Sequence, residues 1–282
     1  MLFKEYIAAS ARAPDYCLGA IIKCLITVGE LELLWTQLWE RLQNKELFLH
    51  HITNHIENDD IHRVNPIISQ ALVEYWLKIS PAQLEEIILK MDWTCLDLNQ
   101  VLKAAKKYKL YKAQIFLNAN ALHDFTISLT ELIPLLDFEH PDLGNCLLVY
   151  ISSCLAGRGY PQGEIPEELK QNVKHDVLRC LTSLHSTTNE ADELPYPYLR
   201  ALLKFDCRET LNVISLAFQE KEFNCELGFQ HRKRIINILL EIMTPENNTV
   251  SKSLYEFIEY LLKFHSCSLK KSGPKSDVYS IL

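Results

Sequence analysis

Four histidines lie close together in the sequence, at His50, His51, His55 and His62. Because His51 and His55 are four residues apart, a helix would place both imidazoles on one face, where they could contribute to a zinc site. Such a site needs three or four ligands, and this segment has neither an HExxH pattern nor a pair of cysteines nearby. We therefore interpret these residues as ordinary histidines on a helix flank, and we expect neither a metal nor another cofactor.

The other reactive residue types form no recognised catalytic pattern. The sequence lacks the phosphate-binding GxxxxGK[ST] loop, a GxGxxG segment after a strand and the GxSxG turn of serine hydrolases. Gly157-Arg158-Gly159 resembles part of a nucleotide-binding loop, but it follows an apolar, helix-sized segment and is better explained as a turn. Ser152 and Ser153 lie inside that segment, where serine usually bonds to the preceding helical turn. The sequence therefore predicts a protein that is not an enzyme.

Charge and cysteine usage restrict the classes of partner. A net charge of −7 argues against nucleic acid or an anionic membrane as the main partner. No run reaches the roughly 18 apolar residues that a membrane-spanning helix needs. The nine cysteines include no CxxC pair and lie mostly in apolar stripes, as small buried side chains do in a reducing compartment. We expect a cytoplasmic protein.

One dense basic cluster stands out in this acidic chain. It consists of Lys103, Lys106, Lys107, Lys109 and Lys112. The simplest interpretation is a solvated helix face. A second interpretation is a weak contact for an acidic lipid or for an acidic segment of a partner protein.

The segment 143–185 predicts the unit from which the fold is built. Its first half, up to Leu155, is almost entirely apolar, so a helix there must be covered on nearly all sides. Its second half begins at Pro166, carries Glu167 and Glu168 in its first turn and is apolar on one face only. A loop rich in glycine and proline joins the two halves. The pattern is typical of an antiparallel helical hairpin, the unit of helical solenoids.

Helix-start signals recur along the rest of the chain. Asn65 precedes Pro66, Ser80 precedes Pro81, and Asp97 and Asp206 each precede a periodic apolar segment, as N-cap residues do. Another helix is expected at 229–243, with apolar residues on one side and Arg232, Lys233 and Arg234 on the other.

These segments predict an all-α fold. Glycine contributes only 8 of 282 residues, and no alternating pattern persists long enough to indicate a sheet. Helix pairs recur at intervals of about 35 to 45 residues, as in helical repeats. We predict an α-solenoid of stacked antiparallel helical hairpins over residues 1–265, with a flexible polar tail at 266–282.

The apolar stripes identify the expected core. Its members are Leu147, Tyr150, Ile151, Leu155, Leu181, Leu202, Phe205, Leu211 and Phe218. Asp206, Arg208 and Glu209 stand at a predicted helix start, where they could form a charge network. Because an unpaired buried charge is costly, we expect Arg208 to pair with a carboxylate.

Long strings in the sequence resemble one known family. LLVYISSCLAGRGYPQGEIPEEL, at 147–169, and PYLRALLKFDCRETLNVISLAFQ, at 197–219, resemble the central region of the family of vacuolar protein sorting-associated protein 8. LDLNQVLKAAKKYKLYKAQIFLNANALHDF, at 96–125, is similar to the helical pairs of clathrin-heavy-chain-type repeats. The resemblance is greatest over residues 93–243.

The resemblance implies a function in membrane traffic. Members of this family are subunits of CORVET, which binds an endosomal Rab GTPase and tethers early endosomal vesicles before fusion. They combine a β-propeller, a long α-solenoid and a RING-type zinc domain. This chain contains only solenoid-like sequence, and because it has no CxxC pair we expect it not to include the RING domain. The resemblance also implies that the Rab contact is made mainly through other regions.

The chain is thus expected to be a non-enzymatic scaffold segment that supports tethering and fusion of early endosomes and traffic to the vacuole or lysosome. Its expected partners are other class C tethering-complex subunits. The expected location is the cytoplasm, peripheral on early and late endosome membranes through indirect contacts.

Two alternatives remain at this stage. A peptide-binding helical-repeat adaptor unrelated to tethering would have a concave groove lined by exposed aromatic side chains or by a single charge sign. A metal-dependent activity at His50, His51 and His55 would require tight zinc binding.

Overall fold

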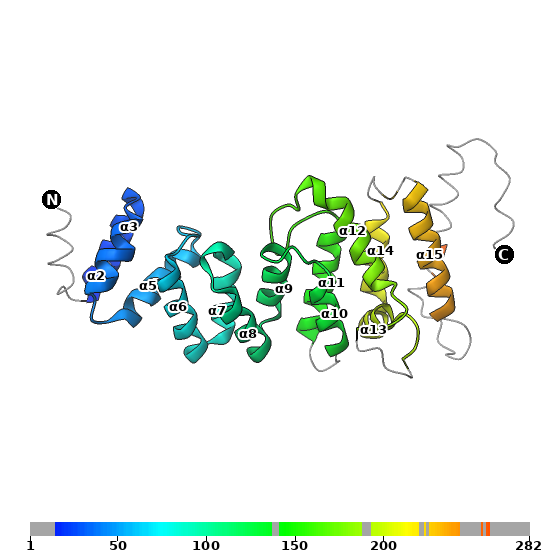
Figure 1. Ribbon diagram of the computed structural model, residues 1–282, viewed down its shortest axis with the longest axis horizontal. Coiled ribbons are helices and arrows are strands. Elements are labelled where there is room, and N and C mark those ends of the chain that lie inside the picture. Colours follow the sequence, from blue (N-terminus) through cyan, green and yellow to red (C-terminus); the bar gives the residue numbers. More distant parts are fainter. Residues whose placement is uncertain are drawn as a thin grey trace. The chain divides into compact units, whose positions relative to one another are not determined.

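The computed structural model describes residues 15–136, 141–187, 193–219 and 226–242, together with residues 223, 255, 258 and 259. In these parts of the chain the regular secondary structure is helical throughout, and no strand is present. Contacts divide the chain into two compact units, residues 1–123 and 124–282. Figure 1 labels their helices. The predicted all-α helical-repeat fold is confirmed. The predicted polar tail at 266–282 lies outside the described residues.

The first unit is a series of helices joined by short turns. They are α2 (Asp15–Val28), α3 (Leu31–Leu33), the π-helical turn η1 (Leu34–Leu38), α4 (Trp39–Arg41), α5 (Lys45–Glu57), α6 (Pro66–Ile79), α7 (Pro81–Lys90), the 3₁₀ turn η2 (Trp93–Cys95), α8 (Leu98–Tyr108) and α9 (Tyr111–Asn120). Neighbouring helices pack as pairs, α5 with α6, α6 with α7, and α8 with α9, while α7 also contacts α9. This arrangement is the stacking of hairpins that helical repeats use.

Polar side chains begin these helices as the sequence indicates. Asn65 Oδ1 accepts a hydrogen bond from Ile67 N at 3.0 Å, and Ser80 Oγ accepts one from Gln83 N at 3.3 Å. Each bond satisfies a backbone N–H that has no partner inside the helix. Asn44 and Asp97 act in the same way at the starts of α5 and α8.

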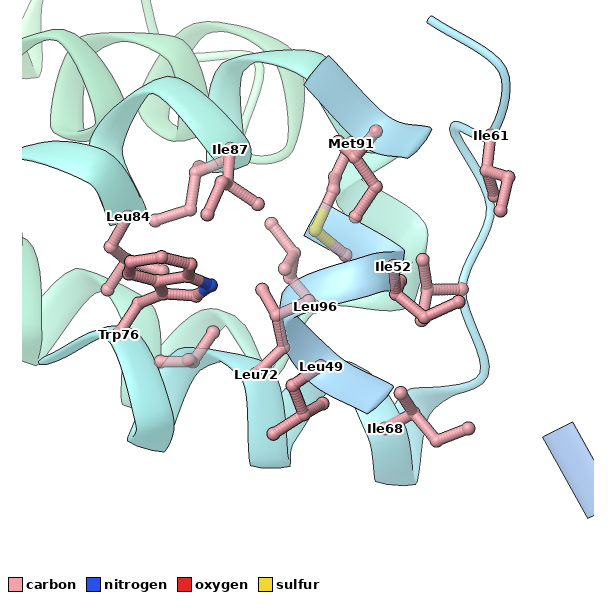
Figure 2. Packing of buried hydrophobic residues seen from close by; sticks show 14 of the residues in the cluster. Leu49, Ile52, Ile61, Ile68, Leu72, Trp76, Leu84, Ile87, Met91 and Leu96 are labelled. Carbon is pink, nitrogen blue, oxygen red and sulfur yellow. The ribbon is translucent and has the colours of Figure 1, made fainter. Parts of the chain in front are cut away.

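The core of the first unit gathers side chains from α2 through α9, and Figure 2 shows the part to which α5, α6 and α7 contribute. Within it, Trp76 contributes a polar group as well as a ring. Its indole Nε1 donates a hydrogen bond to Thr53 Oγ1 at 2.8 Å, and that hydroxyl in turn donates to Leu49 O at 2.9 Å. The hydrogen bond satisfies a buried indole N–H and fixes α6 against α5.

The second unit contains α10 (Ile127–Leu132), the 3₁₀ turn η3 (Ile133–Leu135), α11 (Pro141–Leu155), α12 (Glu167–Leu181), α13 (Pro197–Phe205), α14 (Cys207–Ala217) and α15 (Glu226–Ile242). Helix α11 is its centre, because it packs against both α12 and α14. Only a narrow stripe of α11, which includes Asn145 and Val149, faces solvent. The expectation that this helix is covered on nearly all sides is met.

One glycine permits an unusually close contact inside the second unit. A Cβ atom built on Gly144 of α11 would lie 2.1 Å from Cζ of Phe205, at the end of α13. The aromatic ring therefore lies directly on the backbone of α11. Any side chain at position 144 must displace that ring.

We expect Thr53→Val to lower the free energy of unfolding by about 1 to 3 kcal/mol, because Val fills the same space but leaves the Trp76 N–H buried without an acceptor. Urea denaturation followed by tryptophan fluorescence would measure the change. Thr27→Val is the matched control. Thr27 Oγ1 also donates to a carbonyl four residues earlier, that of Lys23, but Thr27 is exposed. Equal effects of the two substitutions would show that the indole bond contributes nothing.

We expect Gly144→Ala to destabilise the protein by about 1 to 3 kcal/mol, although alanine normally favours a helix over glycine by about 1 kcal/mol. Asn145→Ala, at the neighbouring exposed position, should change stability by less than about 0.5 kcal/mol. Combining Gly144→Ala with Phe205→Ala should recover part of the loss, because the obstructing ring is removed. Additive losses in urea denaturation would contradict the contact.

Candidate functional site

The loop between α11 and α12 is closed by its own backbone. Gly157, with φ of 73°, ends α11 in the left-handed conformation, and its N–H donates to Cys154 O at 3.0 Å. Arg158 N donates to Ser153 O at 2.8 Å, and Gly159 N donates to Gly163 O at 3.0 Å. Because all three N–H groups of Gly157-Arg158-Gly159 are occupied within the chain, this segment is a turn and not a phosphate-binding loop.

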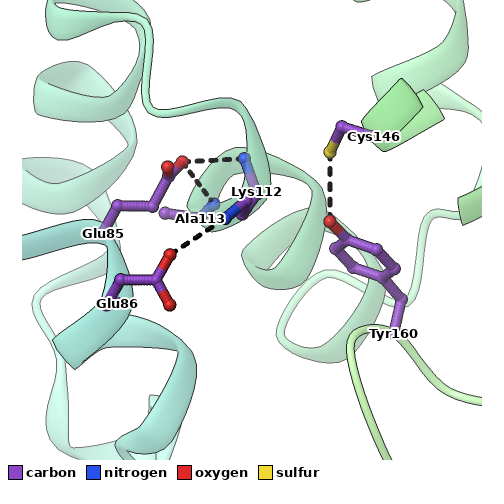
Figure 3. A network of polar contacts seen from close by, with 6 residues as sticks. All are labelled: Glu85, Glu86, Lys112, Ala113, Cys146 and Tyr160. Carbon is purple, nitrogen blue, oxygen red and sulfur yellow. Dashed lines mark hydrogen bonds and ion pairs between the residues drawn. The ribbon is translucent and has the colours of Figure 1, made fainter. Parts of the chain in front are cut away.

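Two tyrosines, one in the loop and one on α11, hold this loop against α11. The hydroxyl of Tyr160 lies 3.0 Å from Cys146 Sγ of α11, as Figure 3 shows, and its ring packs edge-on against that of Tyr150 with centroids 5.4 Å apart. Tyr150 OH donates to Phe125 O at 2.9 Å. Burial raises the pKa of Tyr150, so its phenol keeps the proton that this bond requires. The loop is thereby held in one conformation, with Gln162 among its exposed residues.

The residues predicted to form the core lie mostly in the interior of the second unit. Phe205 differs, since it is only half-buried at the end of α13, with its ring against Gly144. The others are buried: Leu147, Tyr150, Ile151, Leu155, Leu181, Leu202, Leu211 and Phe218.

The predicted charge network at the start of α14 takes a different form. Asp206 Oδ1 accepts a hydrogen bond from Glu209 N at 2.9 Å and caps the helix. Glu209 Oε2 accepts from Asn212 Nδ2 at 3.4 Å. Arg208 is exposed, and no carboxylate pairs with it among the residues that the structure describes. The cost of burying a charge therefore does not arise at Arg208, and the expected ion pair is absent from this part of the structure.

Sequence reasoning missed a threonine beside this cap. Thr210 is buried, and its Oγ1 donates to Leu202 O at 3.0 Å, which joins the first turn of α14 to the last turn of α13. A threonine in the first turn of a helix gives no sequence signal for such a bond, because the acceptor belongs to another helix.

A second missed residue is a buried arginine on α15. Arg232 was expected on the exposed side of its helix, but it is only 5% exposed. Its guanidinium donates to Phe218 O and lies over the rings of Phe218 and Phe229, with distances of 5.5 and 5.6 Å to the ring centroids. Arg234 donates from Nη2 to the carbonyl O of Thr182, the residue that follows α12, at 3.2 Å. The two arginines therefore join α15 to α14 and α12.

The histidines at 50, 51, 55 and 62 share no ligand site, and two of them bond to separate polar partners. His55 Nδ1 lies 2.7 Å from Asp60 Oδ2, and His62 Nδ1 lies 3.0 Å from Lys90 O. Burial, with smaller contributions from His50 and His55, lowers the pKa of His51 and favours its neutral form. Within the described residues, no three His, Cys, Asp or Glu side chains are placed to hold a metal ion.

The basic cluster is exposed where α8 meets α9. Lys103, Lys106, Lys107, Lys109 and Lys112 all face solvent. Lys112 Nζ pairs with Glu86 Oε1 at 2.9 Å. Glu85 accepts hydrogen bonds from the backbone N–H groups of Lys112 and Ala113, at 2.8 and 3.2 Å, at the start of α9 (Figure 3). Burial raises the pKa of Glu85 in spite of these bonds.

Comparison with known proteins identifies one matching family model and several related proteins. A family model described as the central TPR of Vps8 matches residues 47–218. A vacuolar protein sorting-associated protein 8 homolog from Drosophila melanogaster is 74% identical over 251 residues, which are 88% of this chain and 20% of that protein. The Homo sapiens homolog is 35% identical over 249 residues, 83% of this chain and 17% of that protein.

More distant similarity extends to yeast. Vacuolar protein sorting-associated protein 8 of Saccharomyces cerevisiae is 20% identical over 243 residues, 74% of this chain and 19% of that protein. The chain thus spans about a fifth of the length of these relatives. No helix in the described residues is long and apolar enough to cross a membrane.

We expect Asp206→Ala to lower the stability of the protein by about 1 kcal/mol, because the Glu209 N–H loses its acceptor at the start of α14. Arg208→Ala should change stability by less than about 0.5 kcal/mol, since that side chain is exposed. Chemical denaturation of both variants shows whether Asp206 acts alone as a helix cap or forms a charge network with Arg208. A loss of similar size in Arg208→Ala would indicate that the arginine has a structural partner.

Proposed function

Because the chain belongs to the family of vacuolar protein sorting-associated protein 8, we propose that it is a non-enzymatic scaffold segment of an endosomal vesicle-tethering subunit of the CORVET type. The family match over residues 47–218 carries this proposal, since it covers α5 to α14 apart from a few terminal residues. Sorting of proteins to the vacuole is what the relatives' names state. Beyond protein sorting in general, we propose that this chain supports the tethering and fusion of early endosomes.

The packing of the helices supports a mechanical role. In each unit, helices bury their apolar faces against neighbouring helices, so the position of one hairpin constrains the next. The polar side chains that might otherwise suggest chemistry have structural roles, since Asp206 caps α14 while Thr210 and Arg232 bond to the ends of neighbouring helices. A segment of this kind keeps other parts of a long protein at a defined spacing.

The proposed partners are other subunits of the class C tethering complex, bound through surfaces of the folded helices. Contact with a Rab GTPase is assigned to regions of the longer relatives that this chain does not cover, because the chain spans about a fifth of their length. The proposed location is the cytoplasmic face of endosomes. Family membership favours this scaffold over a peptide-binding adaptor unrelated to tethering.

Recovery of tethering-complex subunits with the tagged chain from cells, identified by mass spectrometry, tests this proposal. We expect the intact chain to recover them and Ile151→Asp to lose them, because a charge at that buried position of α11 disrupts the second unit. Val149→Asp is the matched control, since it makes a similar change on the same helix at a side chain that is 58% exposed.

The helical content of each variant, measured by circular dichroism, separates folding from binding. Absence of the subunits with an intact chain that is folded and helical would contradict a scaffold surface in this segment. Loss of the subunits with a folded Val149→Asp variant would support the proposal and place the contact on the exposed stripe of α11.

A further inference from the structure

Two helix-joining turns of the first unit lie at one edge. Gln100 Nε2 of α8 donates to Glu74 Oε1 of α6 at 3.5 Å, and Glu85 of α7 accepts from Lys112 N at the start of α9. These contacts place the first half of α7, which follows the turn at Ser80, beside the first turn of α9, which follows the turn at Lys109. The last turns of α6 and α8 therefore lie on the same side of the unit.

This side carries exposed lysines from both helices, which we call the lysine edge. It is formed by Lys78 in the last turn of α6 and by Lys103, Lys107 and Lys109 on α8 and its C-terminal turn. Lys109 adopts the left-handed conformation, with φ of 59°, at the end of α8. The lysines thus come from the last turn of α6, from α8 and from the turn that follows α8, and not from one helix alone.

Nearby carboxylates of α6 and α7 make contacts within the unit, and one of them, Glu86, has a cationic partner. Glu74 accepts from the Gln100 amide, Glu85 accepts from two backbone N–H groups at the start of α9, and Glu86 pairs with Lys112. Lys112 lies at the adjacent start of α9 and is left out of the lysine edge, because it has this partner. The positive charge of Lys78, Lys103, Lys107 and Lys109 is directed toward solvent.

Exposed apolar side chains accompany the lysines. Ile79, the last residue of α6, is 58% exposed, and Tyr108, the last residue of α8, is 40% exposed. Lys107 Nζ lies 5.2 Å from the centre of the Tyr108 ring. Lysine together with tyrosine and a branched apolar residue at the tips of two turns is the combination that suits a membrane interface, where the charge meets headgroups and the apolar groups enter among them.

We propose that the lysine edge makes a direct contact with the surface of an anionic membrane. A flat anionic surface can reach both turns at once, and phosphatidylserine supplies the negative charge that the lysines require. The contact is weak, because the whole chain carries a net charge of −7. It goes beyond the indirect membrane association expected from the proposed function. It also adds a second attachment that acts when other subunits have brought the chain to the membrane.

Flotation of the purified chain with phosphatidylcholine vesicles, with or without phosphatidylserine, tests this contact. We expect binding only to the vesicles that contain phosphatidylserine, and loss of that binding at high salt. Replacing Lys103, Lys107 and Lys109 by glutamine should weaken binding on the order of 100-fold, which is about fivefold for each lysine. Ile79→Ser should weaken it by a smaller factor that salt does not change.

The control variant replaces Lys23, Arg208 and Lys233 by glutamine. All three are exposed, and the change in net charge is the same. Equal loss in both triple variants, or no binding of the intact chain, would overturn the proposal. Retention of the chain on poly-glutamate beads without vesicle binding would also overturn it, by assigning the lysine edge to an acidic protein segment. The vesicle assay contains no other subunit, so a negative result there does not bear on the scaffold proposal. In the same way, failure to recover subunits from cells does not bear on the membrane contact.

Discussion

Burial of α11 is the constraint on which the second unit depends. A helix with apolar side chains on nearly every side has no stable exposed state, because each leucine or isoleucine left in water forfeits about 1.5 to 3 kcal/mol. Its neighbours α12 and α14 supply the cover, and Gly144 lets the ring of Phe205 lie directly on the helix backbone. The rest of the unit is arranged so that these contacts form together, which is why one charged side chain at Ile151 should affect all of it.

Polar groups then select one arrangement among the many that apolar contacts allow. Trp76 and Thr53, Tyr150 and Phe125 O, and Thr210 and Leu202 O each join different elements through a single hydrogen bond. The net contribution of such a bond to stability is only about 1 kcal/mol, but a wrong register leaves a buried donor without an acceptor and costs more. The apolar faces bring the helices together, and these bonds decide how they lie against one another.

The helices and their starts could be predicted because the signals are local. Ser80 before Pro81, and Asp97 and Asp206 before apolar segments, act on N–H groups three residues away, so the sequence alone shows both partners. Which side chains are exposed to solvent could not be predicted with the same success. Arg208 was expected to need a partner and is exposed, whereas Arg232 was expected in solvent and is buried. Which face of a helix meets a neighbour depends on residues far away in the sequence.

The same distinction explains why a functional surface is harder to find in this protein than its fold. The five lysines near the end of α8 are evident in the sequence, but a run of lysines is most simply a solvated face. Three facts from the structure change that interpretation: Lys78 and Ile79 lie at the same edge, Tyr108 is exposed there, and Glu85 and Glu86 have partners on α9. An overall negative charge does not prevent a local positive surface, because screening limits each charge to a range of about 10 Å. The distribution of charge over the folded helices, and not its sum, decides what this edge can attract.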